Sequence, residues 1–244
     1  MVNGDEQTFS RMWHIKLKHP EEFAWLIPVP GEWHWNLHIL RGIFKVWGGY
    51  ILSPIATRLS YKKYKVDVPN FHNTEDFLEI VTFKIGLLMK ELQEFHPTKT
   101  PIGVMHHYKQ YSPIYEVLYL FNWYLCPYWH TRAALKSGNP ALLNEMWRYW
   151  LGLFITAKKT RYCILTMRFL WLIRYLHPSL AKIFNDFRTF SFSGDANTSI
   201  PIDGLNELVR FLFAMFYCIC VLTFALKYAD QPVLEADEWT PPFH

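Results

Sequence analysis

Cysteine is scarce in this sequence, with only four residues among 244. That density is far below what a disulfide-stabilised scaffold needs, so the class of small disulfide-rich proteins is excluded. Glycine (11 residues) and proline (15 residues) are too few for a collagen-like or low-complexity chain. A strong excess of one charge is also missing, because the formal net charge is +4. A chain that is 51% hydrophobic with so little net charge does not belong to the intrinsically disordered class.

The sequence is rich in aromatic residues, since 18% of its residues are Phe, Trp or Tyr. At this length the chain forms one large domain or two small ones, and either can bury a core. The sequence pI of about 8.8 is compatible with nucleic-acid binding but is insufficient to argue for it. The Cys218-x-Cys220 pair lacks a second pair at zinc-finger spacing, so buried thiols are the favoured interpretation.

The spacing of apolar residues predicts a mainly α fold with two short strands near its start, at about residues 1–4 and 23–29. Asn73 is expected to cap one long helix, Gly48-Gly49 to end another, and residues 190–201 to form a loop. The predicted helices cover residues 6–18, 33–47, 73–95, 114–125, 140–156, 161–176, 180–185 and 202–228. No internal repeat is present, which excludes solenoids and propellers.

Residues 211–226 form a run without any charged side chain, bracketed by Arg210 and Lys227. A helix over this run would rise about 24 Å, whereas a bilayer core is about 30 Å thick. We therefore favour a buried core helix and keep a single membrane span as the alternative. The polar, acidic first ten residues predict that there is no secretory signal peptide.

Four carboxylates lie at predicted element ends, where metal-dependent chemistry is usually placed: Asp5, Glu32, Asp203 and Glu207. Each also has a structural interpretation. Asp5 and Asp203 are suited to cap the helices that follow them, and Glu32 to lie in a solvated turn. Asp203 and Glu207 are one helical turn apart and share a face.

Histidine and lysine add two further patterns. His34 and His38 lie four residues apart at a helix start, which suits either a metal pair or a polar helix edge. The basic turn at residues 158–161 is suited to contact phosphates, although basic turns are more often only solvated. The sequence has no Gly-rich phosphate loop, so no small-molecule cofactor is expected.

Taken in order, three short motifs resemble a known family. They read Gly-Asp-x-Gln-Thr at residues 4–8, Pro-Gly-x-Trp-His at 30–34 and Pro-x-Asp-x-x-x-Glu at 201–207. The segments at 132–139, 150–154 and 160–162 extend the similarity. Together they resemble domain-of-unknown-function family 6589, a set of eukaryotic transposon-derived proteins.

The resemblance implies a partial RNase H-like α/β core related to DDE-type transposases, with a large helical insertion and a long apolar C-terminal helix. It implies a core remnant at residues 1–50, the insertion at 51–200, a core helix at 201–230 and an acidic tail at 231–244. Within that core it implies catalytic roles for Asp5, Asp203 and Glu207. Its implied ligands for Mg²⁺ or Mn²⁺ are Asp5, Glu32, His34 and Glu207.

Departures from the family pattern argue against activity. The strands that precede Asp5 in an RNase H-like core, with their carboxylate, are expected to be missing, so a truncated copy is predicted. Arg210 and Ala214 stand where the family has Asn and Lys, and Arg210 would compete with a metal for Glu207. We therefore expect a catalytically incomplete fragment, intracellular and nuclear, with nucleic acid as its partner. The alternative is a non-enzymatic helical interaction protein, either free or anchored to a membrane through residues 211–226.

Overall fold

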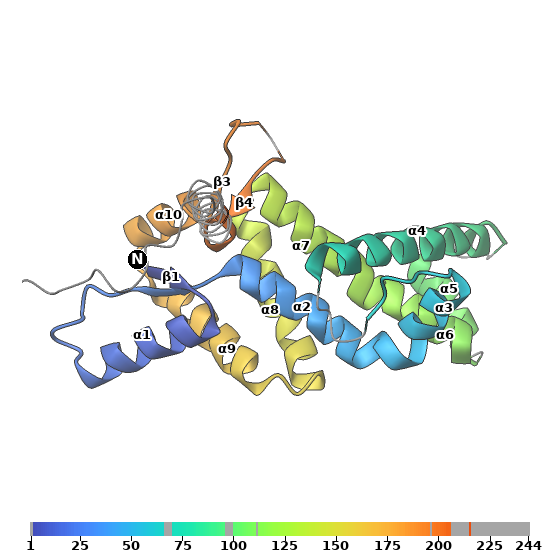
Figure 1. The fold of residues 1–244 in the computed structure, drawn as a ribbon, viewed down its shortest axis with the longest axis horizontal. Coiled ribbons are helices and arrows are strands. Elements are labelled where there is room, and N and C mark those ends of the chain that lie inside the picture. Colours follow the sequence, from blue (N-terminus) through green and yellow to red (C-terminus); the bar gives the residue numbers. More distant parts are fainter. Residues whose placement is uncertain are drawn as a thin grey trace, which may run out of the picture. The chain divides into compact units, whose positions relative to one another are not determined.

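A computed structural model describes residues 2–65, 70–95, 100–110, 112–195, 197–205 and 215. The chain divides into two units, Met1–Gly204 and Leu205–His244, and the fold described below is that of the first unit (Figure 1). Its elements in chain order are β1 (Val2–Gly4), α1 (Glu6–Lys18), β2 (Pro28–Pro30), α2 (Glu32–Trp47), a π-helical turn (Gly48–Leu52), α3 (Ser53–Arg58), α4 (Phe71–Phe95), α5 (Pro101–His107), a 3₁₀ turn (Tyr108–Gln110), α6 (Ser112–Leu120), a second π-helical turn (Phe121–Leu125), α7 (Cys126–Ser137), α8 (Pro140–Thr156), α9 (Thr160–Tyr175), α10 (Pro178–Asp186), β3 (Thr189–Phe190) and β4 (Ile200–Pro201).

The chain begins with a parallel strand–helix–strand unit. β1 pairs with β2 in parallel, with Val2 opposite Pro28 and Gly4 opposite Pro30, and α1 forms the crossover between them. α1 begins at Asp5, whose carboxylate accepts a hydrogen bond from the Thr8 backbone N–H at 2.8 Å. Both strands therefore end beside a helix that starts one or two residues later.

α2 does not stop at the glycine pair as predicted. Gly48 keeps right-handed helical angles, and the chain continues through the π-helical turn into α3. Ile51 and Leu52 on this turn are buried in the core. Burial of two such side chains stabilises by about 1.5–3 kcal/mol each, which exceeds the cost of about 1 kcal/mol for a glycine in a helix.

The core of the first unit is built on aromatic rings that α2, α8 and α9 bring together. Trp35 of α2 stacks on Trp147 of α8, with ring centroids 4.1 Å apart and planes within 12°. Phe169 of α9 lies 4.5 Å from Trp147, and all three rings are fully buried. The same cluster extends from Phe9 on α1 to Phe184 on α10. One continuous core therefore joins the beginning of the chain to residues 147–184.

α4 carries a smaller second cluster with α5 and α6. Met89, Val104, Met105 and Leu118 are its buried members. The predicted capping role of Asn73 is wrong, because α4 begins earlier, at Phe71. The side chain of Asn70 instead accepts a hydrogen bond from the Asn73 backbone N–H, which satisfies one of the free donors of the first turn.

Five elements of the described chain were not predicted: α3, α5, α7, β3 and β4. α7 fills a stretch to which no element was assigned, and it ends at Gly138, which adopts left-handed angles that favour glycine. Residues 190–201, predicted to be a loop, begin and end in the antiparallel strands β3 and β4. These strands are only two residues long each, too short to show strand periodicity in a sequence.

The prediction of a mainly helical fold with two short strands near its start is confirmed. The bounds of α1 and α8 agree with those predicted. Most of the predicted C-terminal helix, at residues 206–214 and 216–228, lies outside the described residues. In the part of the chain that is described, no helix combines the length and apolarity needed to cross a membrane. The RNase H-like relationship and the four domain ranges stay predictions.

Candidate functional site

The N-terminus of α2 is capped by a carboxylate from far along the chain. α2 starts after Gly31, which has no side chain to cap it. The carboxylate of Asp203 accepts hydrogen bonds from the backbone N–H groups of Trp33 at 3.0 Å and His34 at 3.1 Å. It also lies 3.2 Å from Nδ1 of His34 and is almost fully buried. Asp203 therefore caps α2, a helix that begins about 170 residues earlier in the chain.

Gly31 permits this approach because it lacks a Cβ. A Cβ built at Gly31 would lie 2.2 Å from Oδ2 of Asp203, a distance at which something must shift. The backbone at Gly31 has ordinary extended angles, so the requirement for glycine is purely steric. The Pro-Gly-x-Trp-His motif is thus in direct contact with the Asp of the Pro-x-Asp motif.

Asp5 lies near the same histidine. The Thr8 backbone N–H lowers the pKa of Asp5, and the charge of His34 acts in the same direction. Burial raises the pKa of Tyr162 on α9, and the charges of Asp5 and Asp203 reinforce that shift. Asp5, His34 and Asp203 therefore share one neighbourhood, where β1 ends and α2 begins.

A cavity of about 520 Å³ opens beside Asp5 and His34. It is lined by Asp5, Glu6, Gln7, His34, His38, Lys158, Lys159, Thr160, Arg161 and Tyr162. The imidazole of His38 stacks on the ring of Tyr162, with centroids 3.9 Å apart, and its Nδ1 lies 3.5 Å from Nζ of Lys159. Burial, together with the charge of Lys159, lowers the pKa of His38 to about 3, so His38 is neutral at pH 7.

Glu32 is not a solvated turn residue, because it is buried in an ion pair with Arg188. The Nε and Nη2 atoms of Arg188 both donate to Oε1 of Glu32, and Nε1 of Trp147 donates to the same oxygen at 3.4 Å. Arg188 also donates to Oδ1 of Asn144 at 2.6 Å and lies over the ring of Phe184. Burial raises the pKa of Glu32, and Arg188 opposes that shift.

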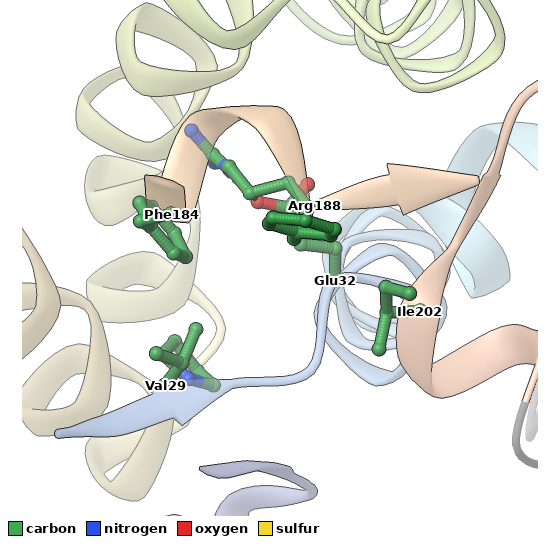
Figure 2. A pocket seen from close by; sticks show the side chains of 7 residues that line it. Val29, Glu32, Phe184, Arg188 and Ile202 are labelled. Carbon is green, nitrogen blue, oxygen red and sulfur yellow. Dashed lines mark hydrogen bonds and ion pairs between the residues drawn. The ribbon is translucent and has the colours of Figure 1, made fainter. Parts of the chain in front are cut away.

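Figure 2 shows this pair at the edge of a second cavity, of about 180 Å³. Val29, Phe184 and Ile202 form its apolar walls beside Glu32 and Arg188. Its small size and mostly apolar lining make it a packing space next to the core, and we assign it no chemistry.

The structure thus brings together Asp5, His34 and Asp203 of the predicted site residues, and turns Glu32 toward Arg188. Glu207 lies outside the described residues. Among those that are described, no group of three His, Cys, Asp or Glu side chains is arranged to hold a metal ion. The predicted roles in catalysis and metal binding therefore stay predictions.

Two residues in this region were missed from the sequence. Arg188 had no motif around it, since its partner Glu32 is 156 positions away. Lys159 belonged to the basic turn that was judged suitable for phosphate, but its position beside His38 depends on the packing of α9 against α2. Only the basic character of residues 158–161 was a usable signal.

The geometry defines a mainly helical domain with an N-terminal strand–helix–strand unit. The helix that follows this unit, α2, is capped by Asp203 from far along the chain. Residues 112–218 match the model of a family of unknown function (DUF6589), which supports the resemblance to that family over this segment. The matched segment contains Asp203 and Glu207, whereas Asp5, Glu32 and His34 precede it. No curated protein and no solved structure matches the chain.

Replacing Gly31 by Ala is expected to lower the free energy of unfolding by about 1–3 kcal/mol, because the new methyl group displaces the Asp203 carboxylate from the α2 N-terminus. The measurement is urea unfolding followed by circular dichroism. Gly152→Ala is the matched control, since a Cβ there meets nothing within 4 Å. It is expected to stabilise by about 0.5–1 kcal/mol, the usual gain for Ala over Gly in a helix. Equal effects of the two substitutions would contradict the assigned contact.

Arg188→Met is expected to lower the free energy of unfolding by about 3–5 kcal/mol, because it leaves the buried charge of Glu32 without its partner. The double variant Glu32→Leu/Arg188→Met removes both charges and is expected to recover most of that loss. Arg148→Met is the control, because the Arg148–Glu145 pair is about 60% exposed on both sides. An exposed pair of this kind contributes about 0–1 kcal/mol. No recovery in the double variant would refute the buried pair.

His38 is expected to destabilise the fold in acid. Its pKa is about 3 when folded and 6.5 when unfolded, so the unfolded chain binds the extra proton between these values. Stability is then full above pH 6.5 and falls as the pH drops toward 3. Thermal unfolding of His38→Gln against pH should show a shallower decline than the wild-type protein. His130→Gln, at an exposed position, should leave the wild-type profile unchanged; a parallel His38→Gln profile would argue against the assignment.

Proposed function

We propose that this protein is a transposon-derived, RNase H-like domain that binds nucleic acid without cleaving it. The RNase H-like relationship is supported by the parallel β1–α1–β2 unit, since Asp5 and Glu32 follow its two strands directly. Parallel strands that end side by side carry their following residues to one edge of a sheet, which is where such domains hold their carboxylates.

The carboxylates expected to bind metal already have structural roles, which argues against cleavage. Asp5 caps α1, Asp203 caps α2, and Glu32 pairs with Arg188. Two-metal cleavage needs several anionic oxygens free to coordinate the ions, because Mg²⁺ demands near-octahedral coordination. A carboxylate moved to a metal here would abandon a helix cap or expose a buried arginine. Mg²⁺ or Mn²⁺ would therefore compete with the fold for these groups.

The observation that carries the binding proposal is the basic rim of the cavity beside Asp5. Lys158 and Arg161 are exposed and Lys159 is half-buried, all at the start of α9. α9 has no side-chain cap at its N-terminus, so its first backbone N–H groups add to the positive potential. Glu6 partly offsets this charge, because it lies 3.8 Å from Arg161. A phosphodiester backbone is the anionic ligand that such an open, cationic rim fits best.

Lys158→Gln is expected to weaken duplex DNA binding and to reduce the slope of log affinity against log salt by about 0.9, the value for one lost phosphate contact. Fluorescence anisotropy with a labelled duplex over a salt series measures both quantities. Lys84→Gln on α4 is the matched control, since it removes one exposed lysine elsewhere. Equal slopes in both variants, or strand cleavage by wild type with Mn²⁺, would each contradict part of the proposal.

A non-enzymatic interaction protein is the second candidate function. It is favoured by α4, where Ile80, Phe83 and Leu87 lie at helical spacing and are 40%, 64% and 43% exposed. Absence of any nucleic-acid binding in the experiment above would favour this candidate. Its membrane-anchored form depends on residues 211–226, of which the structure describes only Met215.

A further inference from the structure

α9 is a helix on which exposed aromatic side chains share one face with an exposed arginine, Arg161, and a half-buried one, Arg168. Arg161, Ile164, Arg168, Trp171 and Tyr175 follow one another at intervals of three or four residues, which places them along a single stripe. Trp171 is 57% exposed and Tyr175 is 64% exposed. From Arg161 to Tyr175 the stripe is about 21 Å long, at 1.5 Å of rise per residue.

The two rings on this stripe contact each other, and one of them also contacts a ring of α1. Trp13 of α1 meets the edge of Trp171 with centroids 6.3 Å apart, and Trp171 lies 5.2 Å from Tyr175. Arg168 lies over Trp13, and Arg174 lies over Tyr175. α1 and α9 lie close together at this place in the fold (Figure 1). Trp13 thus contacts Trp171, Trp171 contacts Tyr175, and a guanidinium group lies beside each end of this row of rings.

Charge on the two helices is strongly one-sided. The cationic side chains of α1 and α9 are Arg11, Lys16, Lys18, Arg161, Arg168 and Arg174. The only carboxylate within either helix is Glu6, and Glu21 and Glu22 follow in the turn after α1. Charge complementarity therefore calls for a polyanionic partner.

We infer that the stripe from Arg161 to Tyr175 binds single-stranded nucleic acid, with bases stacked on Trp171 and Tyr175 and phosphates beside the arginines. This inference rests on the proposed function and extends it, because the stripe begins at Arg161 on the rim of the cationic cavity. Exposed aromatic rings next to a basic track are the features that bind unpaired bases without sequence preference. Paired bases in a duplex have no free face to stack on these rings.

The test compares Trp171→Ala with wild type in anisotropy titrations of a labelled oligothymidine strand and of a duplex. Trp171→Ala is expected to bind the single strand roughly ten-fold more weakly, since stacking of one base is worth about 1–3 kcal/mol. Duplex affinity is expected to stay unchanged. Trp123→Ala is the matched control, because it removes a 43% exposed indole that lies on another element. Tyr175→Ala is a second variant at the end of the helix, in case loss of Trp171 disturbs the packing of Trp13.

A sugar–phosphate strand that lacks bases separates stacking from charge. Wild type and Trp171→Ala are expected to bind this strand equally. A loss of oligothymidine affinity that is equal for Trp171→Ala and Trp123→Ala, or is absent from Trp171→Ala and Tyr175→Ala, would overturn the stacking inference. The duplex effect of Lys158→Gln would still report on the proposed function. Sedimentation with phosphatidylserine vesicles, without any binding of either nucleic acid, would overturn both and assign the stripe to an anionic membrane surface.

Discussion

The contact between Asp203 and the first turn of α2 is the constraint on which the arrangement of this site depends. A helix that begins at a glycine has backbone donors and no side chain of its own to satisfy them. Asp203 accepts hydrogen bonds from two of these N–H groups and lies close enough to exclude any Cβ at Gly31. Because Asp203 is 170 residues from Trp33, this cap also joins the two ends of the first unit. The position of His34, between Asp203 and Asp5, follows from it.

The same contact explains why acidic residues at strand ends are not sufficient evidence for metal chemistry. A carboxylate that accepts backbone N–H groups has fewer lone pairs left for a cation, and its movement toward a metal would weaken the helix cap. Asp5 and Asp203 are both in this situation, on α1 and α2 respectively. Glu32 is committed more strongly still, because Arg188 would be left buried and unpaired without it. A metal ion would therefore compete with the backbone N–H groups and with Arg188 for the same carboxylate groups.

Several local signals were read correctly from the sequence, although Asn73 and Gly48-Gly49 were not, and the long-range contacts were missed. The bounds of α1 and α8 followed from Asp5 and from Asn139-Pro140, which act within their own first turns. The contact of Asp203 with α2 was not predicted, since nothing near Asp203 in the sequence identifies that helix. Glu32 was expected in solvent for the same reason: its burial depends on Arg188, 156 residues away. Periodicity indicated a helix at residues 161–176, but its exposed rings carry no signal that distinguishes a binding surface from chance.

The exposed rings indicate a binding surface only when the neighbouring charges are considered together with them. An exposed tryptophan alone contributes to the apolar surface that every folded protein keeps, and a solvated arginine alone is equally ordinary. On α9 the two alternate from Arg168 to Tyr175, along about two turns, and no carboxylate on that helix neutralises the arginines. Salt at physiological concentration screens charges beyond about 8 Å, so Arg168 and Arg174 act mainly on what touches the rings beside them. A ligand that combines a flat aromatic face with a negative charge at short range satisfies both features at once. An unpaired nucleotide is such a ligand, and a base-free polyanion is not, which is why the response of Trp171 to removal of the bases discriminates between them.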